Sequence, residues 1–134
     1  MDEQAGLSDQ YSRASPWPVF VALGLAISEV GIVMALFPLA VGGLLLFAGS
    51  VTGILQESDH IETPWPLLSG IGVFLLVVGA GLVLSQTAGL SLDAVVAALE
   101  AMNGLVFRGL SILLSGAILA IGGVVGAVAE PARL

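Results

Sequence analysis

One apolar run at residues 16–55, PWPVFVALGLAISEVGIVMALFPLAVGGLLLFAGSVTGIL, decides the fold of this chain. A single helix of that length would be about 60 Å long, twice the roughly 30 Å thickness of membrane hydrocarbon. The run must therefore reverse direction. Its one interruption is LFPL, where Pro38 cannot continue a preceding helix but fits the first turn of a new one. The sequence predicts two spans, at about 17–37 and 39–56, joined by a tight turn.

The composition identifies the solvent. Hydrophobic residues make up 57% of the chain and charged residues 10%, whereas a soluble domain is about 45–50% apolar and about 25% charged. Too few polar residues are present to cover a water-facing surface, so we expect membrane lipid to surround most of the chain. At roughly 20 residues per span, 134 residues allow at most four crossings with their connections. The sequence predicts a multi-pass protein of the cell membrane.

The second half of the chain predicts two further spans, at about 65–84 and 105–128. The segment between them, SLDAVVAALEAMNG, has apolar residues at helical spacing and Ser91 as a candidate N-cap. We expect a short amphipathic helix at about 91–102, and a helical extension of the fourth span is the alternative. The predicted fold is an all-α integral membrane domain at 16–134 with four transmembrane helices, preceded by a polar, acidic tail at 1–15.

The two tryptophans occur in one repeated tetrapeptide, SPWP at 15–18 and TPWP at 63–66. In each copy the first proline restricts the residue before it to extended geometry, and the second fits the first helical turn. Trp17 and Trp65 are therefore expected to anchor two helix starts at the same membrane interface. The sequence predicts two repeated hairpins in parallel orientation, the second with an inserted segment.

Glycines recur at matching positions of the two predicted hairpins. The alignment that superposes SPWP on TPWP also places Gly24 on Gly72 and Gly31 on Gly79, and a second, larger offset relates the second and fourth spans. Small residues on one helix face allow close backbone approach in membranes. Whether these glycines pack within the bundle or against a partner stays open. The candidate helix-packing residues are Gly24, Gly31, Gly49, Gly53, Gly72, Gly79, Gly122 and Gly126; the second offset also places Gly43 on Gly116 and Glu57 on Glu130.

Glu29 lies inside the first predicted span, in LAISEVGIVM. Carboxylates inside a membrane are rare and are functional candidates by default. Three interpretations are open: a proton relay or ion site, an internal pair, and a contact with a larger partner subunit. For the internal pair, Arg108 is the cation at a suitable depth, and Ser28, Ser111 and Ser115 are candidate hydrogen-bond donors.

The charge balance excludes several classes of partner and chemistry. The chain has ten acidic residues and only three arginines, and its formal net charge is −7. No basic surface is therefore expected for binding nucleic acid or anionic lipid. An acidic surface without lysine suits a cytoplasm of concentrated salt, where charge repulsion is screened. The chain has no cysteine, and His60 is its one histidine. We therefore expect no metal site, no cofactor, no catalytic residue and no enzyme activity.

The membrane orientation rests on three arginines. Arg13 and Arg133 lie on the side of the two termini, and Arg108 lies near the opposite face. The excess of positive charge predicts that both termini are cytoplasmic. The N-terminal residues, MDEQAGLSDQYSRASP, lack the basic and then apolar pattern of a signal peptide, so we expect a retained cytosolic tail.

The stretches GLSDQYSRASPWPVFVALGLAISEVGIV at 6–33, FPLAVGGLLLFAGSVTGIL at 37–55 and TPWPLL at 63–68 resemble a known family. This family is the small hydrophobic "cox cluster" proteins of halophilic archaea, which are named for genes that accompany those of haem-copper terminal oxidases. The resemblance implies a non-catalytic accessory subunit or assembly factor of a respiratory oxidase, with larger membrane subunits as partners. It transfers no functional residue, because the family has no established catalytic motif.

Two alternatives remain open from the residues alone. A small self-associating transporter or channel component would use Glu29 as its coupling site. A homo-oligomer also suits this class of protein, because four short helices enclose little space.

Overall fold

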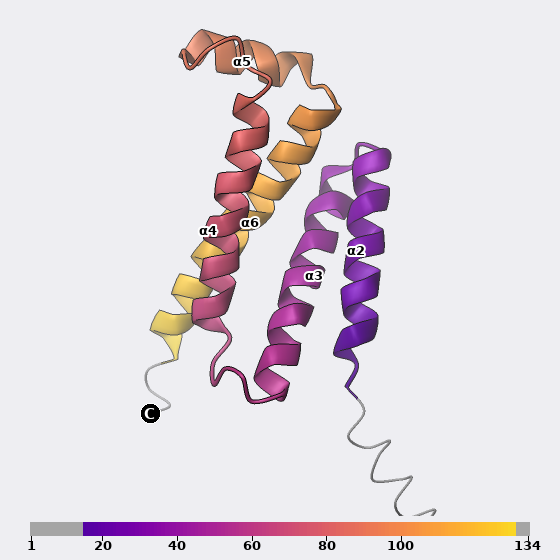
Figure 1. Cartoon of the computed structure of the whole chain (residues 1–134), viewed down its shortest axis with the longest axis vertical. Helices are drawn as coiled ribbons and strands as arrows, with labels where there is room; N and C mark the ends of the chain where they lie inside the picture. The colour runs from indigo at the N-terminus through magenta and orange to yellow at the C-terminus, as the bar shows by residue number, and fades with distance from the viewer. Residues whose placement is uncertain (1–14, 131–134) are drawn as a thin grey trace, which may run out of the picture.

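A computed structural model of the chain describes residues 15–130, which contain five α-helices and no strand. Figure 1 shows them as two long helical hairpins with a short helix across one end. Of the polar tail predicted at 1–15, all but Ser15 lies outside the described residues, as do Arg13 and Arg133. The helices are α2 (Trp17–Val33), α3 (Phe37–Glu57), α4 (Trp65–Leu84), α5 (Leu92–Ala101) and α6 (Gly104–Ala129).

Each hairpin is an antiparallel helix pair. The first consists of α2 and α3, and the second consists of α4 and α6, with α5 in the connection between them. The start of α2, the loop at 58–64 between α3 and α4 and the end of α6 lie at one end of the bundle, called here the near end (Figure 1). The turn between α2 and α3 and helix α5 lie at the opposite, far end.

Three of the described helices, α3, α4 and α6, are long and apolar enough to cross a membrane. Helix α2 is equally apolar but has only 17 residues, against the usual length of about 20 for a span. The all-helical fold predicted from the sequence is thus confirmed for residues 15–130, and three of the helices are compatible with a membrane protein.

The repeated Pro-Trp-Pro tetrapeptides start two helices. Helix α2 begins at Trp17 and α4 begins at Trp65, as predicted, and each has a proline in its first turn. Pro16 and Pro64 occupy the N-cap positions. A missing N–H is harmless at this point, because the first N–H groups of a helix have no partner within the helix.

The end of the first helix differs from the prediction. Helix α2 ends at Val33 rather than Phe37, and α3 begins at Phe37 rather than residue 39. The reversal lies before Pro38 because Ala35 takes a left-handed conformation, with φ of 56°. The N–H of Leu36 then donates to the carbonyl of Gly31 at 2.8 Å, which closes the helix with a Schellman-type cap.

Helix α5 is separate from α6. Met102 is left-handed, with φ of 31°, and the Asn103 side chain accepts a hydrogen bond from the N–H of Val106 at 2.8 Å to cap α6. The predicted Ser91 cap is confirmed, since its hydroxyl accepts from the N–H of Ala94 at 3.1 Å. A continuous extension of the last helix, the alternative considered above, is therefore wrong. The cause is local, because the left-handed residue and the new cap both interrupt the helical hydrogen bonds.

The two hairpins contact each other mainly through α3 and α6. At the far end, the rings of Phe37 and Phe107 stack with centroids 4.2 Å apart and an interplanar angle of 30°. The fully buried side chains are no larger than valine, among them Ala40 and Ser111, both 0% exposed. The bundle is therefore held by close approach of helix backbones rather than by a thick layer of large side chains.

Candidate functional site

Glu29 and Arg108 lie next to each other at the surface between the two hairpins. Helix α2 carries Glu29 and α6 carries Arg108, and Nη1 of the arginine lies 3.5 Å from Oε1 of the glutamate. The side chains are 52% and 41% exposed, respectively. The structure thus places the two candidate residues in one ion pair and leaves about half of it open to the surroundings.

The depth of Glu29 follows from helix geometry. Glu29 comes twelve residues after Trp17 in α2, a rise of about 18 Å. With Trp17 at the near interface, where tryptophan is enriched, the carboxylate stops about 12 Å short of the far side of a roughly 30 Å hydrocarbon layer. If α2 crosses the membrane in this way, the ion pair lies at a depth where water is scarce.

The three serines considered as partners of Glu29 do not contact it. Ser28 donates to the carbonyl of Leu25 at 2.8 Å, and Ser111 donates to that of Phe107 at 2.9 Å. Ser115 likewise donates to the carbonyl of Ser111, at 2.8 Å. The expectation of a serine donor is wrong because a helical serine reaches a carbonyl three or four residues back in its own helix more easily than a neighbouring helix.

The repeated glycines pack inside the hairpins. A methyl group added at Gly24 of α2 would lie 2.5 Å from the backbone N of Phe47 in α3, and one at Gly72 of α4 would lie 2.6 Å from the carbonyl of Gly116 in α6. Gly31 faces the backbone of α3 in the same way, and Gly79 faces that of α6. These four glycines therefore let the two helices of each hairpin touch backbone to backbone.

The second pair of matched glycines accommodates the tryptophans. An added methyl group at Gly53 would meet the ring of Trp17, and one at Gly126 would meet the ring of Trp65. Each tryptophan thus lies across the last turns of the returning helix of its own hairpin. The repeat seen in the sequence is in this way matched by equivalent contacts in space.

Gly49 and Gly122, also candidates for packing, face away from the bundle. A methyl group added at either one meets no atom of the chain within 4 Å. The alignment of the second and fourth spans makes them equivalent positions of the repeat. Although each lies one turn before a glycine that packs on a tryptophan, neither has a neighbour to pack against within the chain.

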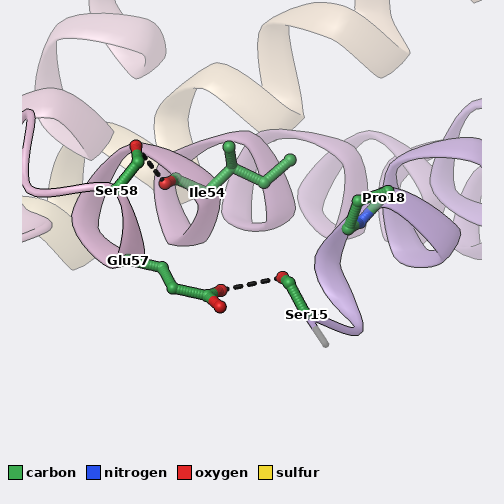
Figure 2. Close-up of a pocket in the computed structure, with 5 residues that line it drawn as sticks. All are labelled: Ser15, Pro18, Ile54, Glu57 and Ser58. Atoms are coloured by element: carbon green, nitrogen blue, oxygen red, sulfur yellow. Dashed lines mark hydrogen bonds between the residues drawn. The ribbon is translucent and has the colours of Figure 1, made fainter. Parts of the chain in front are cut away.

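Carboxylates close both hairpins at the near end, although sequence reasoning gave them no role. The hydroxyl of Ser15 donates to Oε2 of Glu57 at 2.7 Å. Figure 2 shows this bond at the edge of an open hollow of about 280 Å³, which Pro18, Ile54 and Ser58 also line. The bond connects the start of α2 to the end of α3.

The second hairpin has the matching carboxylate. The indole Nε1–H of Trp65 donates to the carboxylate of Glu130, so that the start of α4 is connected to the end of α6. The signal for this role was present in the sequence, because the offset that aligns the second and fourth spans pairs Glu57 with Glu130. The donors differ, a serine hydroxyl in the first hairpin and an indole N–H in the second. Because of this difference, the shared role of the two carboxylates was not predicted from the sequence.

His60 lies in the exposed loop at the near end, where its Nδ1 is 2.9 Å from the hydroxyl of Ser58. Among residues 15–130, no group of three or more potential metal-binding side chains is found. Hydrogen bonds from Ser58 also reach the last turn of α3, so this part of the loop caps the helix.

The comparison with protein families adds one finding. The model of a family described as "Family of unknown function (DUF7541)" matches residues 1–129. The chain belongs to this family. No curated protein and no solved structure matches the chain. The residues matched by the DUF7541 model include both hairpins and α5.

Proposed function

We propose that this DUF7541 protein is a non-catalytic accessory subunit or assembly factor of a larger membrane complex. The observation that carries the proposal is the contrast between a closed interior and an open exterior. The buried hydroxyl groups of Ser50 and Thr52, like those of the serines above, bond to carbonyls of their own helices. No buried side-chain polar atom between residues 15 and 130 lacks a hydrogen-bond partner. The groups left for recognition are on the outer surface.

The surface polar group is suited to contact with protein. An ionised side chain at membrane depth normally faces protein or a water-filled cavity, because lipid cannot solvate it. Half of the Glu29–Arg108 pair is open, and the outward glycines Gly49 and Gly122 allow close approach of another helix. These features support a role in packing.

The proposed complex is a haem-copper terminal oxidase in the membrane of a salt-adapted archaeal cell. This part of the proposal rests on the sequence resemblance to the cox cluster proteins and on the acidic, lysine-free composition. The protein would stabilise the large oxidase subunit or assist its assembly. It would contribute no haem or copper ligand.

Co-purification tests the proposed function. The chain carries an affinity tag and is purified in mild detergent and high salt, and the visible absorption spectrum of the eluate reports haem. We expect a haem spectrum and oxidase subunits in stoichiometric amount if the protein is a subunit, or in small amount from assembling cells if it is an assembly factor. A tagged membrane protein of similar size and abundance is the control. If the eluate contains no haem, whether the cells are harvested during oxidase assembly or after it, the oxidase proposal is contradicted.

We also propose that all four long helices cross the membrane and that both termini are cytoplasmic. Helix α2 would then cross with its apolar turn at 34–36 near the far boundary. The chain has no cysteine, so single-cysteine variants give clean labelling. We expect Ser58→Cys and Thr87→Cys to react with an impermeant maleimide from opposite sides, Ser58→Cys from the cytoplasm. Labelling from one side only contradicts the four-crossing topology.

A further inference from the structure

We propose that the Glu29–Arg108 pair is the centre of a homodimer interface, in which two copies of the chain meet around a twofold axis. Glu29 of each copy would contact Arg108 of the other. The inference rests on the membrane embedding proposed above and adds a partner to it, namely a second copy of this chain.

The first step of the argument is the set of polar atoms that the pair leaves open. One oxygen of Glu29 faces one nitrogen of Arg108 at 3.5 Å, and neither side chain has another hydrogen bond or ion pair within residues 15–130. The second carboxylate oxygen and the remaining guanidinium N–H groups are therefore open to a partner. A guanidinium has five donors and a carboxylate accepts several hydrogen bonds, so most of the capacity of both groups is unused.

The second step is the energetic cost of this situation. Polar groups without partners are costly in hydrocarbon, because no water is present to bind them. Arg108 comes four residues after the start of α6 at Gly104, a rise of about 6 Å, and its side chain is 41% exposed with Nη1 3.5 Å from Glu29. Covering the pair with matching polar groups would remove this cost.

The third step identifies the occupant. The patch contains one acid and one base side by side, so a twofold axis between two copies places each acid on the base of the other copy. The four groups then form a closed ring of alternating charge with no net charge. An interface of this kind is isologous and self-complementary, and no unidentified partner is needed to explain it.

The surface around the pair permits the approach. Ala22 and Ala26 lie seven and three residues before Glu29, on the same face of α2, and both are exposed. Small side chains at this spacing let a second helix come close. Val33, one turn after Glu29, is 80% exposed and would provide an apolar rim.

Disulfide crosslinking of single-cysteine variants in liposomes tests the dimer. We expect Ala26→Cys to crosslink to a second copy under mild oxidation. The matched control is Phe74→Cys, which is the equivalent position of the second hairpin and is 66% exposed; it should crosslink only at the background rate. Equal crosslinking of the two variants overturns the proposal.

Charge exchange tests the ring itself. In the Ala26→Cys background, Glu29→Arg should weaken the dimer about ten-fold, because four like charges then meet. The double variant Glu29→Arg with Arg108→Glu restores both the internal and the intermolecular pairs and should restore crosslinking. The neutral variant Glu29→Gln, which leaves helix packing intact, should give an intermediate loss. Crosslinking that is indifferent to all three variants overturns the proposal.

Two further outcomes distinguish failure of the homodimer proposal from failure of the proposed function. Extraction of the chain from membranes by alkaline carbonate would show that membrane embedding, and with it the dimer, is wrong. An embedded chain that co-purifies with a haem-containing complex but shows no specific crosslink would overturn the dimer alone and leave the accessory role in place.

Discussion

The α2–α3 and α4–α6 hairpins share their internal contacts and differ where they meet. Gly24 and Gly72 occupy equivalent places against the returning helix, and Trp17 and Trp65 lie equivalently on glycines of that helix. The contacts between the hairpins have no such equivalence. The two hairpins are thus equivalent in their internal packing, and the contact between them is asymmetric.

The residues that join the hairpins show this asymmetry directly. The repeat equivalent of Glu29 is Val77, which is 67% exposed, and the equivalent of Arg108 is Ala35. Phe107 likewise corresponds to Met34 rather than to Phe37. The ion pair and the ring stack therefore have no counterpart at the matching positions of the other hairpin and are particular to the contact between the two hairpins. The following predictions test that distinction.

Placing a carboxylate at the repeat equivalent of Glu29 should have the largest effect. In Val77→Glu the new charge has no counterpart of Arg108, because the first hairpin has Ala35 at that place. We expect insertion of α4 to become less favourable by on the order of 2.5–3.5 kcal/mol. A translocon insertion assay with glycosylation sites on both sides of α4 measures this, with Val77→Leu as control. Equal insertion of the two variants would show that position 77 does not face lipid.

Filling the equivalent glycines should destabilise both hairpins to a similar extent. Gly24→Leu and Gly72→Leu place a side chain against backbone atoms that cannot move aside, and we expect a loss of about 1–3 kcal/mol in the free energy of unfolding for each. Unfolding by sodium dodecyl sulfate in mixed micelles, followed by tryptophan fluorescence, measures it. Gly49→Leu and Gly122→Leu should stay within about 0.5 kcal/mol of the parent chain. Losses of the same size in these outward controls would contradict the assignment of Gly24 and Gly72 to the helix contacts, and clearly unequal losses at Gly24 and Gly72 would contradict the equivalence of the two hairpins.

Removing the stacking of Phe37 and Phe107 should weaken the contact between the two hairpins and leave each hairpin unchanged. Phe107 is 6% exposed and stacks on Phe37, so Phe107→Leu should cost about 0.5–1.5 kcal/mol beyond its small loss of buried area. The same micelle titration measures the change. Phe74, at 66% exposure, provides the control, since Phe74→Leu should be nearly neutral. A larger loss of unfolding free energy for Phe74→Leu than for Phe107→Leu would refute the role of the ring stack in the contact between the hairpins.

A glycine in the turn of the first hairpin should give the smallest effect, and a stabilising one. Ala35 has φ of 56°, a left-handed conformation that is unfavourable for alanine and free of strain for glycine. Relief of a penalty of about 1–2 kcal/mol, less the greater conformational entropy of glycine in the unfolded chain, should raise the free energy of unfolding of Ala35→Gly by about 0.5–1 kcal/mol. Ala26→Gly, inside α2, should lower it by about 0.5–1 kcal/mol. Two changes of the same sign would contradict the left-handed turn.

Much of the fold could be predicted because the signals for helix ends are local. Proline at the starts of α2 and α4 and the capping side chains of Ser91 and Asn103 act within one turn of chain. The prediction failed at residues 33–37, where a left-handed alanine ends the helix earlier than Pro38 requires. No residue there is of a type that favours a left-handed conformation, so the early end of α2 could not be predicted from the residue types.

The candidate site could be predicted only in part. Glu29 and Arg108 were candidates because so few charges lie in apolar segments. The competing serine partners could not be dismissed without coordinates, because a serine can donate either to its own helix or to a neighbour. The near-end carboxylates Glu57 and Glu130 received no role, because an offset between repeats shows equivalence but not contact.

The sequence alone therefore determined the apolar helices, most of their ends and the repeated Pro-Trp-Pro starts. Tertiary structure alone decided which glycines face inward and which side chains join the hairpins. The physical reason is that these helices are apolar on every side, so hydrophobicity does not distinguish a face that packs on protein from one that faces lipid. Gly49 and Gly53 belong to one small-residue pair in the sequence, yet only Gly53 packs within the chain. Which of the two glycines packs within the chain depends on how the helices cross, and no local sequence signal encodes that crossing.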